Sequence, residues 1–332
     1  MVEACPGSDP VLELMKASIP LRAKLMTLAA LLAVVPAGFI GYRLVDVNTV
    51  TVKELSREVQ LAVLDDVSRT INREFSDAQD GLLAVGRVLA DEDLAAEVTI
   101  ALALALVEAN EALDHAVIYS AEGQLIDVIR QDNAPEIEPP ELLPEVIRQH
   151  AAELNVATGE AEIRAGSARI LMAVPLRVAG RITGYVTTWL ALEVVQERIE
   201  HLARARFGGR NDSVFVVDRN LRLLARPDRE RVARLASAAE EGILQTDPSE
   251  LFRPDLVRSG EFQASDGTPM LGSSMVVPGR PWAVIAQIPQ SEADASLRGM
   301  RLTVLVTSAA AAILALLLGF GRRAGSPPPW RA

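Results

Sequence analysis

The feature that most constrains the fold is a helical pattern that runs without a proline from Leu44 to Leu89. Apolar and small residues recur along it at three- and four-residue spacing, the period of one buried helix face, while charged residues occupy the other face. The apolar stripe comprises Leu55, Val59, Ala62, Val63, Val67, Ile71, Ala78, Leu82, Val85 and Leu89. One helix of this length would extend roughly 70 Å at about 1.5 Å per residue, far beyond the helices of ordinary globular domains. The pattern predicts a helical spine, residues 43–90, along which the rest of the chain packs.

Two uncharged apolar segments lie on either side of the central chain, at Leu25–Tyr42 and Leu302–Phe320. Each approaches the length that a helix needs to cross a hydrocarbon core of roughly 30 Å, so we predict two transmembrane helices. The first is predicted to be a retained anchor and not a cleaved signal peptide, because residues 1–24 precede it and no small-residue cleavage site follows. Basic residues before the first segment and after the second predict that both tails, 1–24 and 321–332, are cytoplasmic and that the central part lies outside.

Charge and residue usage exclude several classes of function. A net charge of -11 and a pI near 5 argue against nucleic acid as a partner, because no basic run is available to neutralise phosphates. The lone Cys5 excludes an intrachain disulfide and a multi-cysteine zinc site. His115, His150 and His201 lie in unlike contexts without metal-ligand spacing, so we predict no metal, no cofactor, no catalytic residue and no enzymatic activity.

The chain between the spine and the second apolar segment contains a weak internal repeat in the order of its elements. In the first copy, 91–207, helices are predicted at Leu94–Leu113, Glu145–Glu153 and Glu193–Phe207, and strands at His115–Tyr119, Gln124–Arg130, Glu160–Ile163, Ala168–Leu176 and Thr183–Leu192. In the second copy, 208–298, strands are predicted at Ser213–Val217, Leu221–Ala225, Gly260–Ala264, Pro269–Val276 and Trp282–Gln287. The expected fold class is therefore α+β, with a long N-terminal helix and two tandem antiparallel sheet modules between two transmembrane helices.

This layout resembles the double Cache (dCache) extracellular sensor domains of bacterial chemoreceptors, sensor histidine kinases and nucleotide cyclases. The resemblance covers about Asp46 to Ala295 and is carried by EANEALDHAVIYSAEGQLI, LMAVPLRVAGRITGYVTTWLAL, VFVVDRNLRLLARPD and PWAVIAQIPQSEA. It implies two PAS-like modules, a membrane-distal one (91–207) that holds a small-molecule ligand and a membrane-proximal one (208–298) that passes the change on.

The resemblance also implies a place in a signalling system. The chain would be a two-pass protein of the bacterial inner membrane with a periplasmic central domain, acting in chemotaxis or a two-component system. We expect a homodimer that forms along the spine stripe and signals through the second transmembrane helix. No HAMP linker, kinase or cyclase domain follows Phe320, so the output partner is expected to be a separate cytoplasmic kinase, cyclase or chemotaxis protein.

The ligand itself is not predicted by the resemblance. Amino-acid-sensing members of the family carry a set of tyrosine, arginine, tryptophan and aspartate residues over the distal sheet. Arg164, Arg169 and Trp189 are present here, but they are not followed by a tyrosine and an aspartate at the required spacing. An amino-acid ligand is therefore not predicted.

Candidate ligand-binding residues come from their positions on the strands of the distal module. They are Tyr119, Asp127, Arg130, Arg169, Tyr185 and Trp189. Asp127 and Arg130 differ by three positions, so in a regular strand they face opposite sides and one of them lines a given pocket. An arginine beside an aromatic wall and a hydroxyl would suit a small carboxylate-bearing ligand. The alternative interpretation places the aromatic residues in the core and the arginines on the surface.

Two functions of different classes are consistent with these patterns. The first is a membrane-anchored extracytoplasmic ligand sensor that transmits a change through the second transmembrane helix. The second is a membrane-tethered periplasmic binding or scaffold protein without a signalling output of its own.

Overall fold

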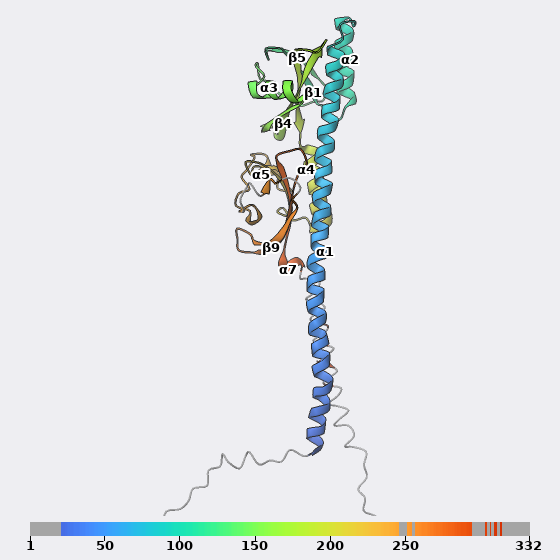
Figure 1. Cartoon of the computed structure of the whole chain (residues 1–332), viewed down its shortest axis with the longest axis vertical. Helices are drawn as coiled ribbons and strands as arrows, with labels where there is room; N and C mark the ends of the chain where they lie inside the picture. Colours follow the sequence, from blue (N-terminus) through green and yellow to red (C-terminus); the bar gives the residue numbers. More distant parts are fainter. Residues whose placement is uncertain are drawn as a thin grey trace, which may run out of the picture. The chain divides into compact units, whose positions relative to one another are not determined.

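The computed structural model describes residues 21–245, 251–253, 256–293 and the single positions 303, 306, 309, 310 and 313. The chain divides into a unit of residues 1–54 with 292–332, and a unit Leu55–Ser291 that contains both sheets (Figure 1). Helix α1 runs from Leu21 to Leu89. No helix in the described part of the chain combines the length and the apolar character needed to cross a membrane. Most of the predicted second span, 302–320, lies outside the described residues.

Within the larger unit, the apolar stripe of α1 packs against both sheets (Figure 1). Most stripe residues are buried, namely Val63, Val67, Ile71, Ala78, Leu82 and Val85, and the core of this unit adds Leu64 and Phe75 from the same helix. Leu55, near the start of the unit, is 58% exposed. The chain's own strands bury most of this stripe, so those residues are not available to a second chain, and the homodimer stays a prediction.

The first sheet contains five antiparallel strands in the order β2-β1-β5-β4-β3. Its elements are α2 (Ala96–Ala109), β1 (His115–Ser120), β2 (Leu125–Arg130), α3 (Glu145–Leu154), β3 (Ala157–Arg164), β4 (Ser167–Val178) and β5 (Arg181–Ala191), followed by α4 (Glu193–Phe207). Alternate residues of each strand point to opposite sides of the sheet. One side packs against α1, and the other is covered by α3.

The second sheet repeats this order as β7-β6-β10-β9-β8, again antiparallel. Its elements are β6 (Val214–Asp218), β7 (Leu223–Ala225), α5 (Arg229–Val232), the 3₁₀ helix η2 (Gly242–Leu244), β8 (Arg258–Gln263), β9 (Pro269–Val276), β10 (Trp282–Pro289) and α7 (Gln290–Ala293). Adding five to each strand number of the first sheet gives the order of the second. The predicted α+β fold, with a long N-terminal helix and two antiparallel five-stranded sheets, is confirmed.

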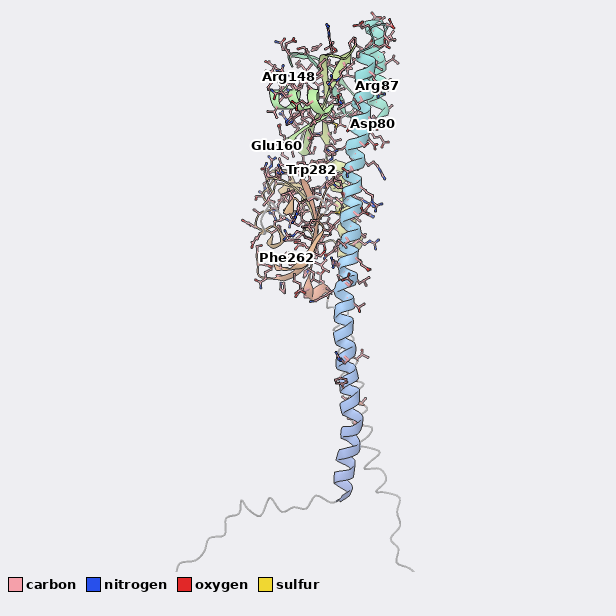
Figure 2. All side chains as sticks on the ribbon, in the orientation of Figure 1. Asp80, Arg87, Arg148, Glu160, Phe262 and Trp282 are labelled. Atoms are coloured by element: carbon pink, nitrogen blue, oxygen red, sulfur yellow. The ribbon has the colours of Figure 1, made fainter. Side chains whose placement is uncertain are left out.

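The second sheet is attached to α1 through aromatic contacts. The ring of Phe75 on α1 meets the ring of Trp282 on β10 edge to face, with centroids 5.2 Å apart (Figure 2 labels Trp282). The guanidinium of Arg280 lies 3.4 Å from the centroid of the same Phe75 ring. A T-shaped aromatic pair and a cation over a ring are both favourable arrangements, so this cluster fixes the sheet on the helix.

Candidate functional site

The face of the first sheet that α3 covers, called the front face here, gathers the aromatic residues predicted for the site. Tyr119, Tyr185 and Trp189 are buried in one cluster with Ile147 of α3. The Tyr119 hydroxyl donates a hydrogen bond to the Pro140 carbonyl at 3.0 Å, which ties the proline-rich loop to the sheet. Burial raises the pKa of Tyr119 to about 12, so this hydroxyl keeps its proton. The three aromatic residues therefore form the floor of the front face.

Arg169 also lies on the front face and is 5% exposed, although its residue type is usually found at the surface. Its Nη1 donates to Asp114 Oδ2 at 2.6 Å and to the Trp189 carbonyl at 3.1 Å. The Trp189 amide in turn donates to His115 Nε2 at 3.2 Å. The structure thus brings Arg169 and Trp189 together and adds Asp114 and His115 to the site.

Sequence reasoning missed Asp114 and His115, although one signal was available. His115, Val117 and Tyr119 alternate along β1, so they share the front face. The pairing of Val117 with Thr187 then places His115 opposite Trp189 on β5. Finding this contact required the register between two strands that are distant in the sequence.

Four buried polar atoms of the front face lack a hydrogen-bond partner in the described part of the chain. They are His115 Nδ1, Arg169 Nε, Thr187 Oγ1 and Trp189 Nε1. All four residues are at most 5% exposed. Because buried polar groups in proteins are almost always hydrogen-bonded, a cluster of unpaired ones requires an explanation, and a bound molecule is one.

Arg130 and Asp127 take opposite sides of β2, as their spacing predicted. Arg130 pairs with His115 in the strand register, which places it on the front face, and its Nη1 lies 4.0 Å from Glu136 Oε1. Asp127 pairs with Ile118, whose side chain packs on the α1 side. Asp127 Oδ1 accepts a hydrogen bond from the Val128 amide at 2.8 Å. The structure therefore brings Arg130 to the site and does not bring Asp127.

A cavity of about 860 Å³ borders the front face beside β2. It is lined by Val128, Arg130, Gln131, Asp132, Glu136, Ile137, Glu138 and Pro139. The proline-rich loop that forms its outer wall is held in place by Gln131, whose Nε2 donates to the Val107 carbonyl at 2.8 Å and to the Leu113 carbonyl at 2.9 Å. The cavity is thus large enough for a small molecule, and Arg130, which lines it, pairs with His115 in the strand register.

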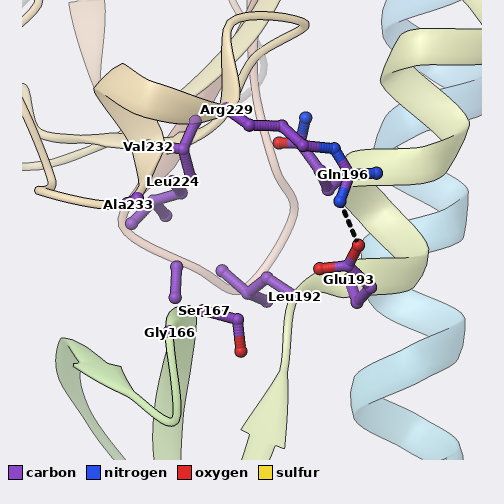
Figure 3. Close-up of a pocket in the computed structure, with 10 residues that line it drawn as sticks. Gly166, Ser167, Leu192, Glu193, Gln196, Leu224, Arg229, Val232 and Ala233 are labelled. Carbon is purple, nitrogen blue, oxygen red and sulfur yellow. Dashed lines mark hydrogen bonds and ion pairs between the residues drawn. The ribbon is translucent and has the colours of Figure 1, made fainter.

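A smaller cavity, about 90 Å³, lies where α4 meets the ends of the two sheets (Figure 3). Arg229 crosses it, with Nη1 2.6 Å from Glu193 Oε1 and Nε 2.5 Å from Glu200 Oε1. These two hydrogen bonds raise the pKa of Arg229 and satisfy its charge. This cavity has little space for a ligand, and the charge of Arg229 is already paired with two carboxylates. We therefore assign the cavity to the contact between the two modules.

Lowering the pH from about 6.5 to about 4 is expected to destabilise the protein through His115. Burial, assisted by Arg169 and Arg130 and opposed by Asp114, lowers the pKa of His115 from 6.5 to about 4. The folded state therefore disfavours protonation, so the stability that the neutral ring contributes is complete above pH 6.5 and is lost as the pH falls toward 4. The loss is about 3 kcal/mol at most, at 1.36 kcal/mol per pKa unit.

The melting temperature of the full chain at a series of pH values checks this expectation, with His115→Gln as the matched variant. Glutamine keeps an acceptor for the Trp189 amide and does not titrate, so its curve should be flatter between pH 4 and 6.5. Parallel curves for the two proteins would show that His115 is not the group responsible.

Groups of three or more histidine, cysteine, aspartate or glutamate side chains that could hold a metal ion are absent from the described residues. No protein-family model matches the sequence, and no curated protein matches it.

Solved structures match the fold over most of the chain. The ligand-binding domain of the Campylobacter jejuni chemoreceptor Tlp3, in complex with L-norvaline, aligns with a TM-score of 0.55 at 14% identity, covering 74% of this chain and 94% of that one. The extracellular domain of soHK1S-Z6, described as a histidine kinase, aligns with a TM-score of 0.54 at 17% identity, covering 75% of this chain and 99% of that one. The ligand-binding domain of the Pseudomonas fluorescens chemoreceptor CtaA, in complex with L-isoleucine, aligns with a TM-score of 0.51 at 17% identity, covering 73% of this chain and 95% of that one. The chain therefore has the fold of the ligand-binding sensory domains of chemoreceptors and histidine kinases, in agreement with the double Cache resemblance of its sequence.

Proposed function

We propose that this chain is the membrane-anchored extracytoplasmic ligand sensor of a bacterial signal-transduction system. Its ligand is a small molecule that binds at the front face of the first sheet, which is the membrane-distal module. The observation that carries this proposal is the set of four unpaired, buried polar atoms on that face, whose edge strand β2 helps to line a cavity of about 860 Å³. The amino acids bound by Tlp3 and CtaA support a small-molecule ligand for this fold.

The proposal includes two transmembrane helices, at 25–42 and 302–320, in the bacterial inner membrane. It rests on the two uncharged apolar segments and on the basic residues that flank them. The central domain then lies in the periplasm. The second span passes the signal to a cytoplasmic kinase, cyclase or chemotaxis partner.

Contacts between the modules supply a route for the signal. Arg222 lies beside β6, and its Nε is 2.7 Å from Asp218 Oδ2 in its own module. Its Nη2 is 3.0 Å from Oε2 of Glu160, on β3 of the first module (Figure 2 labels Glu160). Arg229 joins the second module to Glu193 and Glu200 on α4. A ligand that binds one arrangement of the first module better than another would shift the second module through these contacts.

We propose a homodimer as well, through a surface other than the α1 stripe. Helix α2 exposes three large apolar side chains, Val98, Ile100 and Leu102, each between 43% and 48% exposed. Val98 and Leu102 lie one helical turn apart, with the exposed Ala101 and Ala105 on the same face, so they form a small apolar surface of the kind that marks association sites, while Ile100 lies on another side of the helix.

A thermal-shift screen of the purified full chain tests the sensor proposal. The compounds are small carboxylates, amines, sugars and nucleobases. A ligand at about 100 times its dissociation constant is expected to stabilise the folded state by about 2.7 kcal/mol, which raises the melting temperature by a few degrees.

Matched variants locate the binding site in the same screen. Trp189→Phe removes the unpaired indole N–H and keeps a buried aromatic ring, so it should reduce the shift. Ile126→Ala, at an exposed β2 position, should leave the shift unchanged. If a folded protein responds to no compound, direct sensing is contradicted, and a membrane-tethered binding or scaffold protein becomes the better account.

A further inference from the structure

The charges around the front face are already balanced by residues of the chain. Arg169 Nη1 is 2.6 Å from Asp114 Oδ2, and Arg164 Nη2 is 3.0 Å from Glu162 Oε2 while its guanidinium lies over the Trp189 ring. Both arginines therefore have a carboxylate partner. Neither arginine has a free positive charge to bind a ligand carboxylate. Asp114 and Glu162 would also repel such a carboxylate.

The unpaired atoms of the front face are mostly hydrogen-bond donors. His115 accepts a hydrogen bond at Nε2, so the hydrogen of its neutral ring is on Nδ1. The unpaired Arg169 Nε and Trp189 Nε1 can only donate, and the Thr187 hydroxyl can donate or accept. The group that enters this site must therefore be rich in acceptor atoms, and it need not carry a negative charge.

The adjoining cavity is acidic. Three carboxylates line it, those of Asp132, Glu136 and Glu138, against the single guanidinium of Arg130. The strand register pairs Arg130, which lines the cavity, with His115, so the acidic wall formed by these three carboxylates borders the same sheet face that holds the buried donors. A positively charged group would be attracted to the wall, whereas a negatively charged group would be repelled.

We propose that the ligand is an amine-bearing cation with a neutral hydrogen-bond acceptor, such as an amide or ester carbonyl, and without a free carboxylate. The carbonyl accepts from the buried donors of His115, Arg169 and Trp189, while the ammonium lies against Asp132, Glu136 and Glu138. This inference rests on the proposed sensor function and narrows its ligand class.

Matched pairs of compounds test the proposal by isothermal titration calorimetry on the full chain. The probes are L-isoleucinamide and L-isoleucine methyl ester, each compared with L-isoleucine, together with the corresponding pairs built on L-valine and L-leucine. The amide or ester of at least one pair should bind at least about tenfold more tightly than the free acid, a difference of about 1.4 kcal/mol. Its affinity should fall as salt rises from about 0.1 M to about 1 M, because the Debye length shrinks from about 10 Å to about 3 Å.

Variants of the acidic wall test whether its negative charge contributes to binding, independently of any effect on folding. The triple change Asp132→Asn, Glu136→Gln and Glu138→Gln should weaken amide binding roughly tenfold and abolish most of its salt dependence. Glu153→Gln, at an exposed position on α3 outside the cavity, should bind as the parent does. Equal melting temperatures would show that the triple variant is folded.

The outcomes distinguish this proposal from the sensor function on which it rests. Tighter binding of the free acids, or binding of compounds without an amine in the broader screen, overturns the ligand class and leaves the sensor function intact. Failure of all amines in the panel also overturns the ligand class. Failure of every compound in both experiments overturns the ligand class and the sensor function together.

Discussion

Replacing Phe75 by alanine is expected to lower the free energy of unfolding by about 3–5 kcal/mol, the usual cost of removing a buried phenylalanine ring. The side chain is 1% exposed and lies between Trp282 on one sheet and the guanidinium of Arg280. Its loss leaves a cavity between α1 and the second sheet. Arg280 also loses the ring over which its partly buried charge is placed.

Urea unfolding of the full chain, followed by tryptophan fluorescence, measures this effect because Trp282 contacts the deleted ring. Leu55→Ala is the control, since it removes a large apolar side chain that is 58% exposed on the same helix. The control should change stability by about 0.5 kcal/mol or less. A similar small change for Phe75→Ala would mean that α1 does not pack on the second sheet in solution.

The packing of α1 was predictable because helical spacing needs only local sequence. Ile71, Leu82 and Val85 recur on one face, and the structure buries all three. Phe75 was left out of the predicted stripe although it lies four residues after Ile71 and three before Ala78, so helical spacing could have included it. What the spacing could not show is that Trp282 and Arg280 contact its ring. The same limit applies to the dimer expected along the stripe, since periodicity shows that a face is buried and not what covers it.

Element boundaries depended on contacts that a local pattern does not contain. The first helix after the spine was predicted to reach Leu113, but α2 ends at Ala109. Asn110, which follows, donates its side-chain amide to the Asp77 carbonyl on α1 at 3.0 Å. Its backbone there is extended rather than helical, so a tertiary contact accompanies the end of the helix.

The shared sheet face of the aromatic candidates was predictable from the sequence, whereas the placement of the charged candidates was less so. Tyr185 and Trp189 share a face because strands alternate with a period of two. The alternative interpretation, with the aromatic residues in the core and the arginines on the surface, agrees with the buried aromatic cluster and with the exposed Arg130, and fails for Arg169, which is 5% exposed. A charged residue in a strand can be predicted to be buried only when its ion-pair partner is known. The partner of Arg169 is Asp114, which is 55 residues away in the sequence.

Replacing Asp114 by alanine is expected to destabilise the protein by about 3–5 kcal/mol, the cost of leaving one member of a buried ion pair without its partner. The Arg169 side chain is 6% exposed, and that of Asp114 is 30% exposed. Without the carboxylate, the guanidinium keeps the Trp189 carbonyl at 3.1 Å as an acceptor but loses the charge that compensates its own. Because the Arg169 side chain is buried, solvent replaces little of the lost interaction.

The double variant Asp114→Ala with Arg169→Met separates the cost of an unpaired charge from the worth of the pair. Methionine fills much of the buried volume of arginine without a charge, so the double variant should be more stable than Asp114→Ala alone. Urea unfolding of the parent, both single variants and the double variant gives the coupling energy directly. If the two single changes simply add, the ion pair does not act as a unit, and the balanced charge on which the proposed ligand class depends is contradicted. If the double variant recovers stability, Asp114 serves chiefly to neutralise Arg169, which leaves the donors of the front face available to a neutral acceptor.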